Sequence, residues 1–537
     1  MLAYVLIVVT VAIAVSALAE RRNFQPALLV VMVGLAASYI PGIPQLEIDP
    51  QVILTIVLPP MLFSAARDFS FAEFLRRMGS IVNLGVFLVF ATAVGVGAAS
   101  IGALPELLPI TVLILGVVVA PPDAVAAIAI GRRAGLPVGL MTVLKGESLI
   151  NDAAALTMFS VLVAVATGTH AFIDNVPLYF LYASAVGIAV GLLVGNLAHW
   201  VRSRIASPSL ATAFSVIVPF AAYLTAEELH ASGVLAVVAA GFSIGHHAVQ
   251  AGYEERMQES AFWRTIDTLL ETFVFAYIGL QLRFVITDAN EAGLDATELT
   301  VTTLTIFVTL VAIRAIWVFA SAWVGRRRVI RRRERPLRAG RRQRPAPPAP
   351  LTSKENTVLA WTGMRGVVTL AAAAGTPLLT ATGDPFPGRE AIVSLAFLVT
   401  IASLLIQGLT LPWLIGRLEL DDPNHDRFVA TQRARAEQLI EAASHEALDA
   451  YARDHSGPRS ERLVTMMRQR ILHDQKAEKP RGIDTDEALV LGKLLLEARR
   501  SRLVAARDQL ELDDTIVRDM LEKLDLEQAF MDSVAEG

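Results

Sequence analysis

The sequence of 537 residues contains no cysteine and few charged residues. The absence of cysteine excludes a disulfide framework, thiol chemistry and a cysteine-ligated metal site. Only 18% of the residues are charged, whereas charged residues make up about one quarter of a soluble globular protein. Hydrophobic residues account for 54% of the chain, and its mean hydropathy is +0.52. This balance excludes an ordinary soluble domain and predicts a polytopic membrane protein.

The charge is unevenly distributed along the chain, so the net charge of −4 averages two different parts. Residues 1–420 contain long apolar runs, and residues 421–537 are rich in Arg, Glu and Asp. We therefore expect a transmembrane domain over 1–420, followed by a tail over 421–537. The tail combines apolar residues at helical spacing with charge, as in "ALVLGKLLLEARRSRLVAARDQLEL". That pattern predicts an amphipathic helical bundle, which packs on itself or on a second copy. A regulatory partner for the tail is the alternative.

The apolar runs predict an all-α membrane domain. A spanning helix needs about 20 mostly apolar residues, and this length gives about 13 transmembrane helices. The expected segments lie near residues 2–19, 25–42, 50–66, 79–101, 108–130, 143–167, 176–200, 209–227, 232–247, 262–282, 300–324, 356–379 and 390–416.

The positions of Lys and Arg predict the orientation in a cell membrane. The first apolar segment has no positive charge before it, and Arg21 and Arg22 follow it. This order favours a retained first span with its N-terminus outside over a cleaved signal peptide. Nearly every Arg of the connections then falls on the cytoplasmic side, and the tail is cytoplasmic as well.

The connection over 325–350 is a dense Arg run that ends in "RPAPPAP". We expect a basic cytoplasmic loop that contacts anionic lipid headgroups. No nucleic-acid partner is expected, because a loop held at a bilayer is badly placed to bind a nucleic-acid duplex.

Charged residues inside predicted spans are functional hypotheses, because they are costly in a bilayer. Four stand out, namely Asp123, Glu147, Asp152 and Arg314, and Arg365, near the start of the span over 356–379, is a fifth candidate. Lys145, Asp267 and Glu271 stand nearer the cytoplasmic ends of their spans. We expect these three side chains to reach water rather than to take part in function.

Helix geometry divides the polar residues of the span over 143–167 into two faces. Residues four apart share a face, so Ser148 lies with Asp152 and Glu147 lies with Asn151. The two faces are about 100° apart. The hydroxyl and carboxylate of the first face suit a hard cation. The carboxylate and amide of the second face suit a buried Arg.

Two spans are expected to be interrupted. Pro121 and Pro122 directly precede Asp123, and prolines break a helix by removing backbone donors. Gly363 and Gly366 cluster around an Arg in the span over 356–379. Broken backbone at membrane depth lines protein or water and frees carbonyl groups, as at the ion sites of secondary transporters. The interruptions fall in the fifth and twelfth spans, and this spacing predicts inverted repeats.

The stretch "GESLINDAAA" at 146–155 resembles the signature of the monovalent cation/proton antiporters of the sodium/proton exchanger type, whose bacterial members are called NhaP-like. Further matching stretches occur in the family's order and cover roughly residues 1–420. They are "LPPMLFSAA" at 58–66, "APPDAVAAIAI" at 120–130, "SGVLAVVAAG" at 232–241, "YIGLQL" at 277–282 and "GMRGVVTLAAA" at 363–373. The tail resembles the helical extension of the bacterial subgroup.

This resemblance implies an ion site. Asp152 would bind either the cation or the proton. Asp123, Ser148 and the backbone carbonyl of Pro122 would complete the shell around Na⁺. The chain departs from the family next to Asp123. Many relatives have Thr before this aspartate and Pro after it, whereas this chain has Pro122 and Ala124. A second departure is Ser64, where relatives often carry Glu.

The resemblance also implies a structural network. Glu147 would pair with Arg314, and Asn151 would lie in the same network. Arg365 would satisfy the carbonyl ends of its broken helix. Pairing of Glu147 with Arg365 is the alternative that the sequence leaves open.

For function, the resemblance implies exchange of Na⁺ for H⁺ by alternating access, with K⁺/H⁺ exchange as the alternative. Asn151 stands where electrogenic relatives have a second Asp, which implies one proton for one cation. No cofactor is expected beyond the transported ions, and the family's members are homodimers. An intramembrane aspartyl protease also uses two aspartates on consecutive spans, but the sequence has no Gly-x-Gly-Asp stretch. A passive cation channel is a further alternative.

Overall fold

The computed structural model describes residues 2–22, 24–45, 52–103, 107–123, 125–168, 173, 175–248, 251–291, 295–333, 351–420, 423–455, 457–473, 485–509 and 511–536. The chain divides into two compact units. The membrane unit comprises Met1–Ala206, Leu210–His246 and Ala261–Asp421. The tail unit comprises Ser207–Ser209, His247–Ser260 and Asp422–Gly537. The tail unit therefore takes in two short segments besides 422–537, whereas the expected tail began at residue 421.

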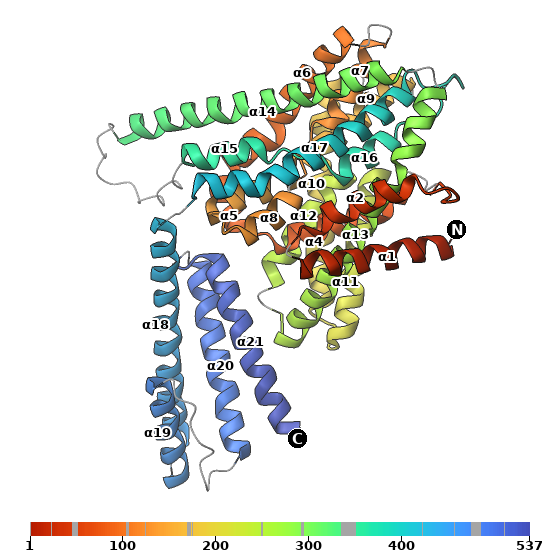
Figure 1. Ribbon diagram of the computed structural model, residues 1–537. Helices are drawn as coiled ribbons and strands as arrows, with labels where there is room; N and C mark the ends of the chain where they lie inside the picture. Colours follow the sequence, from red (N-terminus) through yellow and green to blue (C-terminus); the bar gives the residue numbers. More distant parts are fainter. Residues whose placement is uncertain are drawn as a thin grey trace. The chain divides into compact units, whose positions relative to one another are not determined.

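Helices account for nearly all of the described membrane unit (Figure 1). They are α1 (Leu2–Arg21), α2 (Pro26–Ser38), η1 (Ile53–Val57), α4 (Leu58–Asp68), α5 (Phe71–Val82), η2 (Asn83–Phe87), α6 (Leu88–Ala103), α7 (Pro109–Val119), α8 (Val125–Arg133), α9 (Val138–Thr167), α10 (Val176–Arg202), α11 (Pro208–Glu228), α12 (Gly233–His247), α13 (Tyr253–Glu291), α14 (Ala296–Arg333), α15 (Ser353–Trp361), α16 (Val367–Ala374) and α17 (Arg389–Leu418). Three of them, α11, α12 and α13, also contribute residues to the tail unit.

The predicted apolar segments all contain helix in the structure. In the part of the chain that is described, eight helices are long and apolar enough to cross a membrane by themselves. Shorter apolar helices, such as α2, α7 and α12, occupy other predicted spans. The all-helical membrane architecture is therefore confirmed, and the number of 13 crossings stays a prediction. Of the expected basic loop over 325–350, α14 includes the part up to Arg333, and 334–350 lie outside the described residues.

Both predicted interruptions are present, and they meet. The first lies between α7, which ends at Val119, and α8, which begins at Val125. The second lies between α15 and α16, over residues 362–366. The backbone N–H of Asp123 in the first break donates to the carbonyl of Met364 in the second, over 2.7 Å. The ends of four half-helices are thus brought to one place inside the membrane unit.

Two π-helical turns, η1 and η2, were not predicted. Pro59 and Pro60 follow η1 at the start of α4. Because proline has no backbone N–H, it cannot complete the regular hydrogen-bond ladder of the preceding turn. In η2, a Cβ at Gly85 would lie 3.0 Å from the Cβ of Ile150, so this turn packs closely on α9.

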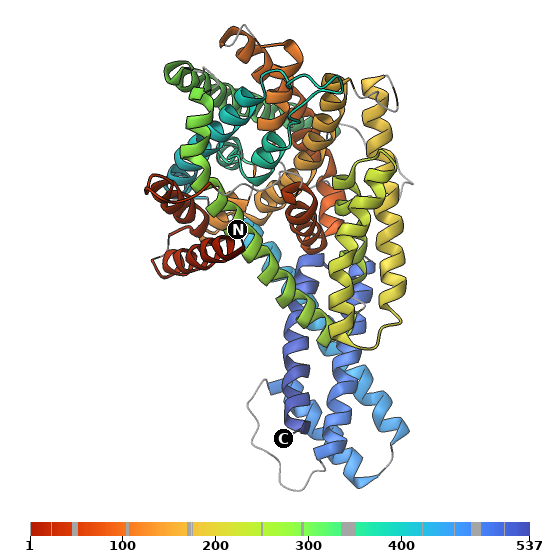
Figure 2. The same cartoon turned by 90° about the vertical axis from the view of Figure 1, so that its right-hand side faces the viewer.

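Glycines allow α10 and α12 to run in close contact (Figure 2). Gly187, Gly191 and Gly195 repeat every four residues on one face of α10. A Cβ at Gly191 would lie only 2.1 Å from the carbonyl oxygen of Ala236. Small residues at this spacing let membrane helices approach each other, where van der Waals packing replaces the hydrophobic effect.

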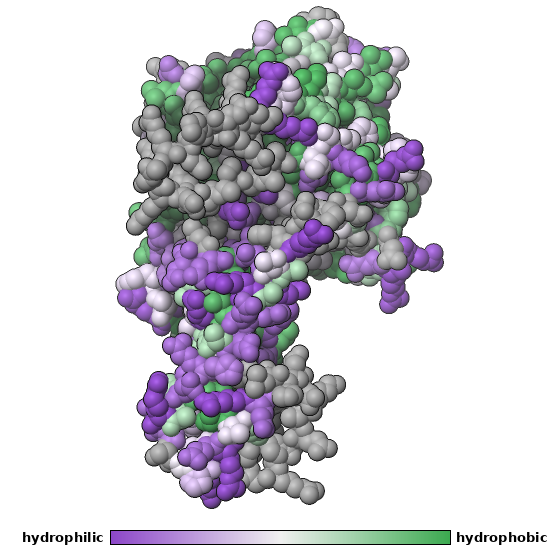
Figure 3. All heavy atoms as spheres, turned by 90° about the vertical axis from the view of Figure 1, so that its left-hand side faces the viewer, coloured by the Kyte–Doolittle hydropathy of each residue, from purple (hydrophilic) through white to green (hydrophobic). Residues whose placement is uncertain are grey.

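The tail unit is built mainly of α18 (Pro423–Asp454), α19 (Pro458–His473), α20 (Thr485–Asp508) and α21 (Asp514–Glu536). Apolar residues at helical spacing form its cores, in which Leu496 and Leu503 of α20 are buried. Asp525 is 3% exposed and accepts hydrogen bonds from both Arg256 and Arg500. The helical tail is therefore confirmed, and Figure 3 shows hydrophilic residues over much of its surface.

Candidate cation and proton site

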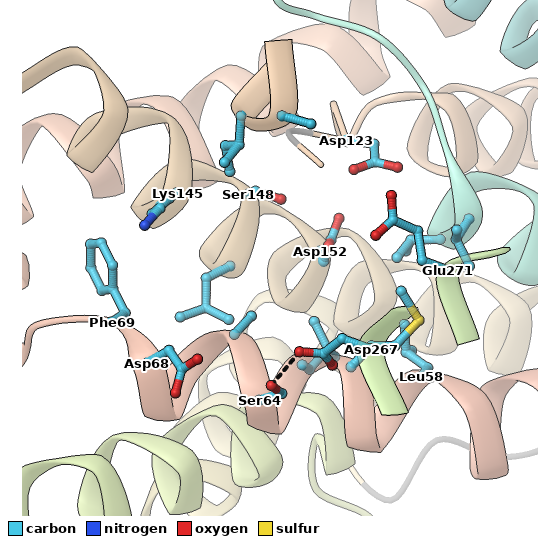
Figure 4. Close-up of a pocket in the computed structure, with 18 residues that line it drawn as sticks. Leu58, Ser64, Asp68, Phe69, Asp123, Lys145, Ser148, Asp152, Asp267 and Glu271 are labelled. Carbon is cyan, nitrogen blue, oxygen red and sulfur yellow. Dashed lines mark hydrogen bonds between the residues drawn. The ribbon is translucent and has the colours of Figure 1, made fainter. Parts of the chain in front are cut away.

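A cavity of about 370 Å³ lies inside the membrane unit. Its walls come from α4, α8, α9, α13 and α16, and from the break between α7 and α8. Figure 4 shows the carboxylates of Asp123, Asp152 and Glu271 directed toward a common region of it. Charged groups thus face a hollow in a part of the chain that is otherwise strongly apolar.

The two faces of α9 have different surroundings. Ser148 and Asp152 line the cavity, whereas Glu147 and Asn151 do not. The side chain of Asp152 is 8% exposed and has no hydrogen-bond or ion-pair partner among the described residues. A buried carboxylate without a protein partner is costly in its ionised form. The site therefore favours a cation or a proton on this carboxylate.

Glu147 forms a buried, bidentate ion pair with Arg314 of α14. Its Oε2 accepts from Nη2 of Arg314 at 3.0 Å, and its Oε1 accepts from Nη1. The two side chains are 1% and 3% exposed. The Nε of Arg314 also donates to the carbonyl of Leu359 over 3.0 Å. Of the two alternatives that the sequence left open, the structure contains the pair with Arg314.

Asn151 takes a different position from the one expected. Its Nδ2 donates to the carbonyl of Pro122 over 3.0 Å, so it ties α9 to the break rather than joining the Glu147–Arg314 pair. The Pro122 carbonyl, expected as an ion ligand, already accepts this hydrogen bond. A carbonyl oxygen has two lone pairs, so one remains for a further donor or cation.

Arg365 lies at the C-terminal ends of two half-helices. Its Nε donates to the carbonyl of Val119 over 2.9 Å, and its Nη2 to that of Ala120 over 3.5 Å. Its Nη1 donates to the carbonyl of Gly363 in its own break. Helix C-termini carry unpaired carbonyls and partial negative charge, so one guanidinium stabilises both breaks.

Asp123 stands just before α8, at the opposite, N-terminal end of a half-helix. Negative charge is favoured there by the helix dipole. A Cβ at Gly366 would lie 1.7 Å from Oδ2 of Asp123, so any larger residue must displace this carboxylate. A Cβ at Gly363 would lie 2.7 Å from Cδ of Arg314. Glycine is therefore needed at both positions, because the second break lies directly against the side chains of Asp123 and Arg314.

Sequence reasoning missed part of the cavity wall. Lys145, Asp267 and Glu271 were expected to reach water near span ends without a part in function, and all three line the cavity. Ser64 lines it too, and its hydroxyl donates to Oδ2 of Asp267 over 2.5 Å. The spacing of four between Asp267 and Glu271, which puts both on one face of α13, was the signal available in the sequence.

The family model described as "Sodium/hydrogen exchanger, transmembrane" matches residues 5–417 of the chain. The chain belongs to the sodium/hydrogen exchanger family. Sodium/hydrogen exchangers are secondary transporters rather than enzymes, so the protease alternative for Asp123 and Asp152 is not retained.

Similar exchangers match most of the chain. An uncharacterized Na⁺/H⁺ exchanger of Mycobacterium tuberculosis is 31% identical over 530 residues, covering 95% of this chain and 92% of that protein. The Na⁺/H⁺ antiporter ApNhaP of Aphanothece halophytica is 30% identical over 449 residues, covering 82% and 79%. The structure of the sodium proton antiporter MjNhaP1 from Methanocaldococcus jannaschii at pH 8 aligns with a TM-score of 0.58 at 16% identity, covering 78% of this chain and 99% of that one. That similarity shows a shared fold.

Proposed function

We propose that the protein exchanges Na⁺ for H⁺ across the membrane, with both ions bound in turn by the carboxylate of Asp152. The observation that carries this proposal is the position of Asp152. It is buried, has no partner among the described residues, and lines the cavity where the two broken helices meet. Membership of the sodium/hydrogen exchanger family supports the same conclusion.

The electrostatics of a buried carboxylate explain why the two ions compete. An ionised Asp152 costs several kcal/mol inside the protein unless a positive charge neutralises it. Either Na⁺ or a proton removes this cost, and one carboxylate holds only one of them at a time. The loaded or protonated site can then be exposed to the other side of the membrane, whereas the bare charge is disfavoured. Because only the Na⁺-loaded or the protonated site changes sides, the flux of Na⁺ is coupled to that of H⁺. This coupling distinguishes an exchanger from a passive channel.

Ser148 and Asp123 support the cation in this proposal. Both line the same cavity as Asp152, and they supply hydroxyl and carboxylate oxygens, which hard cations prefer. The carbonyl of Pro122 has one lone pair left for the ion. Na⁺ is the transported substrate here, so no resident metal or other cofactor is involved.

Glu147, Arg314, Asn151 and Arg365 hold this site in shape. The Glu147–Arg314 pair joins α9 to α14, and Asn151 joins α9 to the first break. Arg365 joins the first break to the second. These bonds fix the relative positions of Asp123 and Asp152 without placing a positive charge in the cavity.

We expect one proton to move for each cation, so that transport is electroneutral. Moving one net charge changes the driving force by about 2.3 kcal/mol per 100 mV, and an electroneutral cycle moves none. In proteoliposomes with a potassium-free voltage clamp, the rate of Na⁺-driven proton flux should therefore be the same at 0 mV and at about 100 mV. A rate that changes severalfold with the imposed potential would contradict one-for-one exchange.

The same vesicles distinguish Na⁺ from K⁺. Relatives named as Na⁺/H⁺ antiporters favour Na⁺. One relative from Bacillus pumilus, 28% identical over 400 residues, is named for sodium, potassium, lithium and rubidium exchange. Comparing proton flux driven by Na⁺, Li⁺ and K⁺ decides between the alternatives. Cation flux that ignores the proton gradient would instead indicate a channel.

We place the protein in the cell membrane with its N-terminus outside and its tail in the cytoplasm, as the distribution of Arg predicts. Leu193, Ile316 and Trp413 are at least 66% exposed, which suits contact with lipid chains. In the view of Figure 3, hydrophobic residues cover much of the upper surface of the membrane unit. The family resemblance favours a homodimer, and a regulatory partner for the tail belongs to the same proposal.

A further inference from the structure

The cavity has a second group of acidic side chains, on α13. Asp267 and Glu271 are four residues apart, so they share one face of that helix, and both line the cavity. In Figure 4 Glu271 is directed toward Asp123 and Asp152, and Asp267 is directed toward Ser64. The exchange described above uses neither residue.

The charge along the cavity wall is strongly unbalanced. Its charged residues are Asp68, Asp123, Lys145, Asp152, Asp267 and Glu271. Asp68 pairs with Arg67, which leaves four carboxylates and the ammonium of Lys145. A cleft lined by charge of one sign and surrounded by low-dielectric walls raises the local concentration of the opposite ion. A small cation is therefore the natural occupant along its whole length.

Two of these carboxylates have no counter-charge of their own. Neither Asp152, which is 8% exposed, nor Glu271 has a hydrogen-bond or ion-pair partner among the described residues. Asp267 differs, because the buried hydroxyl of Ser64 donates to it over 2.5 Å. A hydroxyl that donates to a carboxylate stabilises its ionised form. The Ser64 hydroxyl thus offsets part of the cost of burying an ionised Asp267 at the α4 side of the cavity.

These carboxylates are not gathered around a single point. In the described ranges no group of three or more His, Asp or Glu residues is close enough together to hold one metal ion. The acidic groups of α13 and the Asp152 site are thus spread along the cavity. A cation can move between them without leaving it.

We propose that Asp267 and Glu271, supported by Ser64, form an outer cation-binding station that collects the monovalent cation and passes it to Asp152. Asp267 receives the cation, and Glu271, whose carboxylate is directed toward Asp123 and Asp152 in Figure 4, passes it on. The station sets the apparent affinity for the cation. The transfer to Asp152 rests on the exchange proposed above, whereas binding at the station does not.

The test compares Glu271→Gln and Asp267→Asn with the parent protein. Neutralising one carboxylate several ångströms from a cation, at an effective dielectric constant of about 20, should raise the KM for Na⁺ by about tenfold or more. The maximal rate should be kept, because Asp152 still exchanges its ion. Glu271→Asp retains the charge and should keep the KM near that of the parent. Asp288→Asn, at an exposed position near the end of α13, is the matched control and should change neither value.

Two outcomes would overturn the station. The first is an unchanged KM for Na⁺ in both variants. The second is loss of the maximal rate, as expected for a change at Asp152 itself, in protein that still elutes as a folded species. Equilibrium binding of ²²Na⁺ to the purified full-length protein separates this proposal from the exchange. If Glu271→Gln binds Na⁺ more weakly than the parent does, and the parent itself shows no proton-coupled flux, the station stands and the proposed function fails.

Discussion

Asp152→Asn protein reconstituted in liposomes is expected to show no Na⁺-driven proton flux, while remaining folded. Asparagine has nearly the same size as aspartate, so the packing around α9 is kept. It cannot bind a proton reversibly near neutral pH and has no charge to attract a cation. Because Asp152 has no partner among the described residues, its neutralisation breaks no hydrogen bond or ion pair there. The expected effect is therefore on transport and not on stability.

The measurement is the dequenching of a pH-sensitive dye in vesicles after addition of Na⁺, with size-exclusion chromatography as the check on folding. Asp384→Asn, in an exposed turn of the membrane unit, is the matched control and should transport as the parent does. Retained pH-coupled exchange by Asp152→Asn would remove this residue as the carrier. Loss of folding would show that it has a structural role instead.

Glu147→Gln is expected to destabilise the membrane unit by about 3–5 kcal/mol, the usual cost of removing one partner from a buried ion pair. The substitution leaves the guanidinium of Arg314, which is 3% exposed, without its counter-charge. The remaining hydrogen bond from Arg314 to Leu359 does not neutralise it. Thermal unfolding of the purified protein in detergent, followed by intrinsic fluorescence, measures the loss.

A double variant tests whether the pairing itself is the cause. Replacing both partners by apolar residues, as in Glu147→Leu with Arg314→Met, removes the stranded charge and should recover part of the stability. Arg314 also packs closely against Gly363, so we do not expect the double variant to recover the full stability of the parent. Glu147→Gln protein as thermostable as its parent would contradict a structural role for the pair.

Local patterns predicted the features that depend on neighbouring residues. Pro121 and Pro122 broke the fifth span because the missing backbone donors act within one turn. The spacing of four on α9 separated Ser148 and Asp152, which line the cavity, from Glu147 and its buried pair. These results follow from helix geometry alone and need no knowledge of the tertiary structure.

Features that depend on distant segments were not predictable in the same way. The choice of Arg314 over Arg365 depends on how α14 packs against α9, which no local pattern contains. Asn151 bonds to the break rather than to the ion pair for the same reason. Asp267 and Glu271 were placed near a span end, because the sequence did not reveal that α13 borders the cavity. Two acidic residues sharing one face of an apolar helix should count as a candidate site wherever they stand along it.

The central claim is that one carboxylate holds Na⁺ and H⁺ in turn, and proton release on Na⁺ binding tests it most directly. Purified protein in weakly buffered detergent solution, below the pH at which Asp152 is fully ionised, is titrated with NaCl while the pH is followed. The account predicts that the protein releases protons with a saturable dependence on Na⁺, and that Asp152→Asn releases none. Saturable Na⁺ binding without proton release, or the same release from Asp152→Asn, would contradict it.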